Sequence, residues 1–167
     1  SDYYAGKIVV TDKSGGLSGD SPMAIALVDD IAAIDGVAAA VPGVSTLFDP
    51  ESNGGISMPD MIVGALPGAD HGKNVYDARV AQGRALTAED ADSLVTVLGS
   101  DLARKLGTGI GDTLEIRGMT FDVVGILEPT LTAPDTTAIV PLAAAQDIFV
   151  QDLPPVVQQN LRADRLA

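Results

Sequence analysis

The early part of the chain carries apolar residues at helical spacing. One stripe is formed by Met23, Leu27, Ile31 and Ile34. The three aspartates of this stretch fall off the stripe, which is typical of an amphipathic helix. Ser21 and Pro22 suit the helix start, and Gly36 suits the left-handed position that ends a helix. The pattern therefore predicts a helix that begins near Ser21 and ends at Gly36.

Short apolar runs bounded by glycine, proline and polar residues predict strands. We expect strands over residues 3–11, 37–41 with 44–48, 60–66, 94–98, 113–117, 120–127 and 137–140. Residues 49–59 and 67–73 are predicted as loops. The first strand, the helix and the second strand, which is broken at Pro42 and Gly43, together predict a β-α-β unit.

Capping and turn signals organise the second half of the chain. Thr87 and Asp90 have the spacing of a capping box around a short helical turn. Ser100 is predicted to cap a helix over 100–106 that Gly107 closes. Other predicted features are a turn at Gly111-Asp112, a two-residue hairpin connection at Gly118-Met119, a helix from Pro141 to 149 or 150, and a last helix over 156–166.

These elements predict one α+β domain of 167 residues with two small lobes. The first lobe is the β-α-β unit of residues 1–59. The second lobe, residues 60–153, is rich in strands and contains the hairpin and short helices. Residues 154–167 are predicted to form a C-terminal tail.

Composition excludes several functions. Hydrophobic residues make up 46% of the chain and aromatic residues only 4%, so the core is built from aliphatic side chains. The formal net charge of −13 disfavours binding to nucleic acids and to anionic lipid surfaces, since both need clustered Lys and Arg. The chain has no cysteine, which excludes disulfides, thiolate metal sites and Cys nucleophiles.

No stretch of the sequence approaches the roughly 20 apolar residues that span a bilayer. The chain begins abruptly at Ser1, without a signal peptide, and strand-like sequence follows within a few residues. We therefore expect it to be an excised piece of a longer protein.

Residues 49–60 have the oxygen-rich spacing of a calcium loop. Asp49, Glu51 and Asn53 hold positions one, three and five, and Asp60 holds position twelve. However, position twelve is Asp rather than the usual Glu, and the flanking sequence predicts strands rather than helices. A polar loop between strands is the favoured interpretation, and no metal site is predicted.

No catalytic residue emerges from the other motifs. His71 is the only histidine and lies in a predicted loop, without the nucleophile elbow of a hydrolase. The glycines of 107–112 follow a predicted helix, which is the reverse of a dinucleotide fingerprint. The carboxylate pairs Asp29-Asp30 and Glu89-Asp90 have no aromatic cleft beside them. We expect no enzyme activity and no cofactor in this chain, and binding residues remain unassigned.

Residues 83–149 resemble the extracytoplasmic core domain of MacB/FtsX-type ABC transporter permeases. The motif GRAL at 83–86 is similar to a Gly-Arg-x-Leu that precedes the core in that family. VLGSDLARKL resembles the strand-to-helix segment, GDTLEIRGMTFDVVGIL the hairpin, and AIVPLAAAQDIF the strand and helix that follow. The Val-Pro-Gly-Val turn at 41–44 fits the first lobe more loosely.

The resemblance implies a soluble, extracytoplasmic domain, periplasmic or extracellular, of a cell-membrane protein. It would follow the first transmembrane helix of the permease and precede three more. A separate ATPase would bind ATP, and the partners would be those membrane helices, the ATPase, a second permease copy or homologue and an unknown substrate. The implied roles are export, extraction of lipids or lipoproteins, and mechanical transmission across the membrane.

One departure from the family pattern is that no apolar strand follows Val150, so the fragment is truncated or this member is reduced. An open strand edge would then invite pairing with another copy. Two alternatives stay open. One is a free-standing secreted binding module, stabilised by calcium at residues 49–60, and the other, more remote, is a hydrolase.

Overall fold

A computed structural model describes residues 8, 10, 23–51, 59–67 and 79–159 of the chain. Contacts between residues divide the chain into two compact units. Unit 1 consists of Ser1–Pro42 and His71–Val75, and unit 2 of Gly43–Asp70 and Tyr76–Ala167. Each unit is described by itself. The predicted lobe boundary at residues 59 and 60 stays a prediction.

Unit 1 contains one short helix, α1 (Leu27–Ala32). The helix lies inside the predicted segment but is much shorter, because it begins after a turn at Ile25 and Ala26 rather than at Ser21. None of the described residues of unit 1 is buried, and Leu27 itself is 41% exposed. The apolar stripe therefore does not lead to a buried core within the part of unit 1 that the structure describes.

The second strand predicted for the first lobe, 37–41 with 44–48, is confirmed only at Val44–Leu47. Residues 37–41 belong to no strand, so this part of the prediction is wrong. Three consecutive alanines in this stretch have low strand propensity and offer little surface for cross-strand packing. Of the predicted strand over 3–11, only Ile8 and Val10 are described, and neither lies in a strand.

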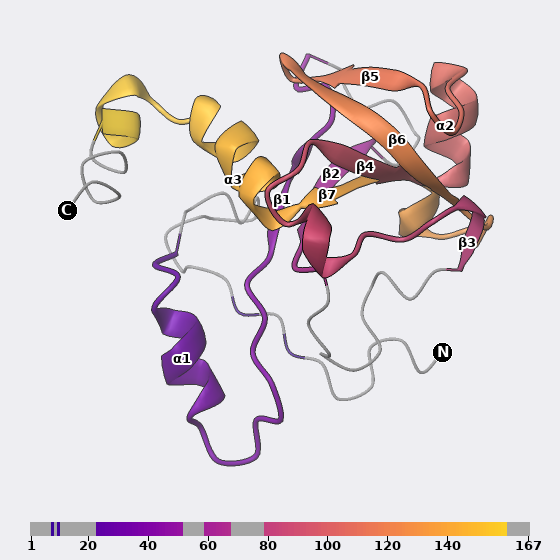
Figure 1. The fold of residues 1–167 in the computed structure, drawn as a ribbon. Helices are drawn as coiled ribbons and strands as arrows, with labels where there is room; N and C mark the ends of the chain where they lie inside the picture. Colours follow the sequence, from indigo (N-terminus) through magenta and orange to yellow (C-terminus); the bar gives the residue numbers. More distant parts are fainter. Residues whose placement is uncertain (1–7, 9, 11–22, 52–58, 68–78, 160–167) are drawn as a thin grey trace. The chain divides into compact units, whose positions relative to one another are not determined.

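Unit 2 is built on a seven-stranded mixed sheet (Figure 1). Its strands are β1 (Val44–Leu47), β2 (Met61–Ala65), β3 (Val80–Gly83), β4 (Val95–Leu98), β5 (Thr113–Ile116), β6 (Met119–Leu127) and β7 (Thr137–Pro141). The order is β1-β2-β7-β4-β6-β3, and β5 also pairs with β6. The β2–β7 and β4–β6 pairs are parallel and the others antiparallel. The predicted α+β class is confirmed.

Two helices, α2 (Ser100–Leu106) and α3 (Leu142–Gln151), pack on one face of this sheet. They share a core cluster with the strands, whose largest buried side chains are Phe121, Ile62, Leu98, Leu102, Ile116 and Ile148. A second, smaller cluster consists of Val97, Leu127 and Ile139, and the partly buried Val80 and Leu86 pack against it. The core is thus aliphatic apart from one phenylalanine, as the composition predicts.

Two local predictions are wrong by one residue. The hairpin connection between β5 and β6 is Arg117-Gly118 rather than Gly118-Met119, and both residues have positive φ, 50° and 78°. This is the geometry of a primed turn, whose twist matches the flanking strands. The N-cap of α2 is Gly99, not Ser100, and the Ser100 hydroxyl is buried with no hydrogen-bond partner among the described residues.

Other predicted elements are confirmed. Gly107 ends α2 in the left-handed region with φ of 64°, and Thr87 and Asp90 form a capping box around the 3₁₀ turn η3 (Ala88–Asp90). A second 3₁₀ turn, η4 (Ala133–Thr136), leads into β7. Among the described residues, no helix has the length and apolar character needed to cross a membrane.

Candidate interaction site

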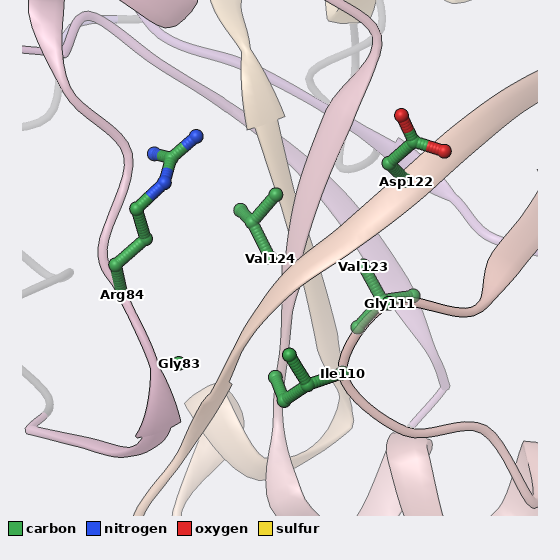
Figure 2. Close-up of a pocket in the computed structure, with 7 residues that line it drawn as sticks. All are labelled: Gly83, Arg84, Ile110, Gly111, Asp122, Val123 and Val124. Carbon is green, nitrogen blue, oxygen red and sulfur yellow. The ribbon is translucent and has the colours of Figure 1, made fainter.

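An open depression lies where two short edge strands meet on β6. Strand β3 pairs with residues 125–127 of β6, whereas β5 pairs with residues 119–122. The depression between them is lined by Gly83, Arg84, Ile110, Gly111, Asp122, Val123 and Val124 (Figure 2). The depression, which we call the seam, therefore lies at the edge of the sheet, and β6 forms its floor.

A β-bulge shapes the floor of this seam. The register of β4 against β6 jumps from Thr96↔Val123 to Val97↔Gly125, so Val124 is the extra residue. Its carbonyl oxygen accepts a hydrogen bond of 2.9 Å from the backbone N–H of Arg84. Bulges of this kind redirect a side chain and interrupt pairing, which here separates the pairing of β3 from that of β5.

Two glycines are required for the close backbone approach at the seam. A Cβ added at Gly83, whose φ is 74°, would lie 2.2 Å from the Val124 carbonyl oxygen. A Cβ at Gly125 would lie 2.2 Å from the Arg84 carbonyl oxygen. Any side chain at either position would push the two strands apart, so the wall of the depression depends on both glycines.

Arg84 is fixed by a buried carboxylate. Its guanidinium donates to both oxygens of Asp90, at 2.6 and 2.9 Å. Asp90 is 5% exposed and also accepts from the backbone N–H and the hydroxyl of Thr87, at 2.7 and 3.0 Å. The hydrogen bonds from Arg84 are the main cause that holds the pKa of Asp90 well below its ordinary value. The pair is a rigid, charged clamp between the end of β3 and η3.

The chemistry of the seam fits recognition rather than reaction. Its charged lining residues are Arg84 and Asp122, and the other side chains that line it are aliphatic. In Figure 2 Val124 and Ile110 lie between Arg84 and Asp122 in the view. A nucleophile with an adjacent general base is not present among these lining residues, and such a pair is what covalent or acid–base catalysis needs.

The candidate calcium residues are only partly described. Asp49 accepts a hydrogen bond of 2.9 Å from the backbone N–H of Glu51, which is a local turn. Asp60 forms an ion pair with Lys105 of α2. Asn53 and His71 lie outside the described residues, and the described ones contain no cluster of three or more potential metal ligands. The polar loop stays the prediction for residues 49–60, and calcium binding there stays the untested alternative.

Sequence reasoning did not identify the clamp as a whole. The capping spacing of Thr87 and Asp90 was visible, and so was the GRAL motif that contains Arg84. The pairing of Arg84 with Asp90 was not, because it depends on the turn between them. The two carboxylate pairs noted in the sequence differ in burial. Asp29 and Asp30 are both exposed on α1, whereas in the second pair Glu89 is exposed and Asp90 is buried. Motifs thus mark several of the site residues, including Gly83 and Arg84, but not the contact between Arg84 and Asp90.

A solved structure supports the fold. The chain is similar to the crystal structure of the periplasmic region of MacB from Actinobacillus actinomycetemcomitans, with a TM-score of 0.56 and 15% sequence identity. The match covers 93% of this chain and 78% of that one. A search of curated proteins finds no match. At this identity the structural likeness establishes the architecture alone.

A family model for the MacB-like periplasmic core domain matches residues 2–164. This match extends well beyond residues 83–149, where the sequence motifs are clearest, and includes the first lobe. It agrees with the mixed α+β architecture of unit 2. The chain therefore belongs to the family of MacB-like periplasmic core domains, which are non-catalytic periplasmic domains of ABC transporter permeases.

Proposed function

We propose that this domain engages a substrate or partner outside the membrane and transmits to it the ATP-driven movement of the membrane helices. The work that this movement performs is export, extraction of lipids or lipoproteins, or mechanical signalling. The energy comes from ATP bound by a separate ATPase, and the domain itself makes or breaks no bond. Its mechanism is conformational.

The observation that carries this proposal is the division of the chain into two units. The resemblance described above implies one membrane helix before this domain and three after it. The first residues of the chain belong to unit 1 and the last to unit 2. Membrane helices that move relative to one another would then act on different units, and a change between the units is the simplest mechanical output.

Unit 2 has the internal connections of a body that moves as a whole. Arg117, in the turn between β5 and β6, forms an ion pair with Asp152 beyond α3 and donates a hydrogen bond of 3.1 Å to the Leu47 carbonyl of β1. Lys105 of α2 pairs with Asp60 before β2. These contacts join segments that are 35, 70 and 45 residues apart. They support transmission of force through unit 2 without local unfolding.

The experiment measures the distance between the units in the assembled transporter. Spin labels are placed on Cys substituted for Asp29 of α1 and for Glu115 of β5, both of which are exposed. The chain contributes no cysteine of its own. We expect the distance distribution to change between the nucleotide-free state and the state trapped with ATP and vanadate.

A matched pair within unit 2 is the control. Labels on Cys substituted for Ala143 of α3 and for Glu115, both exposed, report only the interior geometry of that unit. We expect this distribution to be the same in both nucleotide states. Identical distributions for the first pair in both states, in a transporter that hydrolyses ATP, would overturn the proposal.

A further inference from the structure

The segment that joins β6 to η4 presents a leucine to solvent. The Leu131 side chain is 94% exposed, the highest value among the large hydrophobic residues that the structure describes. Its φ is +58°, in the left-handed region that bulky residues rarely adopt. Exposed leucines are ordinary on protein surfaces. An exposed leucine held in a strained backbone conformation is not.

The strain is held in place by a buried carboxylate. Asp135 is 2% exposed and accepts the backbone N–H of Leu131 at 2.7 Å. It also accepts the backbone N–H of Thr130, at 2.8 and 3.0 Å to its two oxygens, and the Thr130 hydroxyl at 2.9 Å. One side chain therefore binds the N–H groups of two consecutive peptides, those of Thr130 and Leu131.

The same segment is seated closely on the start of α2. A Cβ added at Gly99 would lie 2.1 Å from the Pro134 carbonyl oxygen and 2.4 Å from that of Asp135. Close packing against Gly99 and hydrogen bonds to Asp135 thus both hold the segment in place. This rigidity means that Leu131 is presented in one fixed position, which lowers the entropy that a binding partner must overcome.

Leu131 does not contribute to the core of unit 2. Among the described residues, the only other non-glycine with positive φ is Arg117, whose side chain is 14% exposed and bonded to Leu47 and Asp152. Arg117 therefore has a structural reason for its conformation. Glycine or asparagine would adopt the Leu131 backbone with less strain, so a leucine there needs a reason outside this chain.

We propose that Leu131 is an anchor that inserts into an apolar pocket of a partner protein, a protein other than the permease itself. This inference rests on the proposed function, because it names a point at which the domain engages a partner. Side chains that fill well-packed, desolvated pockets near the centre of a protein interface carry most of its binding energy.

The net charge of the chain favours a partner protein over two other occupants, a lipid surface and a second copy of the chain. A net charge of −13 disfavours an anionic lipid surface, and a single leucine is too small to hold the domain there. A contact through Leu131 between two copies would bring two acidic surfaces together, and this repulsion disfavours a second copy at this point. The charge instead complements a partner whose pocket is surrounded by Lys and Arg, and Glu128, three residues before Leu131, is an exposed negative charge at the base of the segment.

The test uses the complete transporter in its native membrane. The photoreactive amino acid p-benzoylphenylalanine replaces Leu131 or, as a matched control, Val156, which is 69% exposed in the same unit. We expect position 131 to yield an adduct with one separate protein, at least tenfold above position 156. That protein is then purified and titrated against the transporter.

Binding and stability are measured on Leu131→Asn and Val156→Asn. We expect Leu131→Asn to weaken binding of the purified partner roughly ten- to hundredfold, the value of one buried leucine, with a Tm equal to or above that of the parent. Val156→Asn should leave binding unchanged. A Leu131→Asn variant that binds normally, or one whose Tm falls by several degrees, overturns the anchor role.

Three further outcomes overturn the inference. They are adducts with lipid only, adducts with a second copy of the permease only, and no adduct above the control. These are distinguishable from failure of the proposed function, which would appear as unchanged distances between the two units. A transporter whose units move but whose Leu131 finds no partner loses only the anchor.

Discussion

Units 1 and 2 have similar aliphatic sequences and very different packing. Every buried hydrophobic residue of the described chain lies in unit 2, and the described part of unit 1 contributes none. In α1, Leu27 is 41% exposed, whereas Leu102 in α2 is 1% exposed. The contrast shows that an amphipathic stripe predicts a helix face, but a buried core needs a second surface to receive that face.

The two units also differ in how they use aspartate. In unit 1 the described aspartates Asp29, Asp30 and Asp35 are exposed. In unit 2 Asp90 and Asp135 are buried, and each accepts several hydrogen bonds. The described aspartates of unit 1 are therefore solvated, whereas two buried carboxylates hold backbone segments of unit 2.

The largest expected difference concerns the core. Phe121 of β6 is fully buried in the core cluster that the sheet shares with α2 and α3, so Phe121→Ala should lower the free energy of unfolding by about 3–5 kcal/mol. The matched variant Leu27→Ala, on half-exposed α1, should cost less than about 1 kcal/mol. Urea unfolding followed by circular dichroism measures both. Equal losses would mean that unit 1 has a core comparable to that of unit 2.

The second difference concerns Asp135. Asp135→Ala leaves the N–H groups of Thr130 and Leu131 and the Thr130 hydroxyl without their acceptor, which should cost about 2–3 kcal/mol. Asp35→Ala in unit 1 should change stability by less than about 0.5 kcal/mol. Thermal melts of the two variants make the comparison. If Asp135→Ala were as stable as the parent, the segment would not depend on this carboxylate.

Asp135 also illustrates how hydrogen bonds compete with burial. Burial by itself raises the pKa of this carboxyl, since the charged form loses water. Hydrogen bonds from the Thr130 hydroxyl and from the backbone N–H groups of Thr130, Leu131 and Thr132 outweigh burial and hold the pKa below its ordinary value. The carboxylate is therefore ionised at neutral pH despite its position.

The smallest expected difference is a pH dependence at Asp90. Its pKa is lowered in the folded protein, chiefly by the hydrogen bonds from Arg84. The carboxylate therefore stabilises the fold above the pKa of the unfolded chain, about 3.9, and this contribution is lost as the pH falls below that value. Asp90→Asn should cost about 1–2 kcal/mol at pH 7, and the difference from the parent should shrink below pH 4.

Stability measured by urea at several pH values from 3 to 7 checks this prediction. Asp35→Asn, an exposed substitution in unit 1, is the control and should track the parent at every pH. A cost of Asp90→Asn that is the same at pH 3 and pH 7 would mean that the ionised carboxylate is not what stabilises the turn.

The sequence predicted unit 2 well because its signals are local. Alternation of apolar residues marked β5 and β6, Gly107 marked the end of α2, and Thr87 with Asp90 marked the capping box. The hairpin turn moved by only one residue to Arg117-Gly118, whereas the short edge strand β3 was not predicted. Each of the predicted features depends on neighbours within a few residues, which a sequence displays directly.

Unit 1 was predicted less well because its predicted elements depend on contacts between segments rather than on local signals. A strand exists only if a partner strand pairs with it, and residues 37–41 have none in the described structure. The helix of residues 21–35 shortened to Leu27–Ala32, because a short helix needs tertiary packing to extend. In the described structure, neither segment has the tertiary packing that would extend the helix or pair the strand.

The sequence by itself determined the α+β class, the absence of disulfides and the strong negative charge, because these depend on composition and periodicity. Only the tertiary structure decided that Arg84 clamps Asp90, that β3 and β5 meet at a seam on β6, and that Asp135 holds Leu131 exposed. Those features depend on which distant or turning segments come together. Hydrophobic spacing records which side of an element is apolar, whereas contacts between elements are fixed only when the whole sheet assembles.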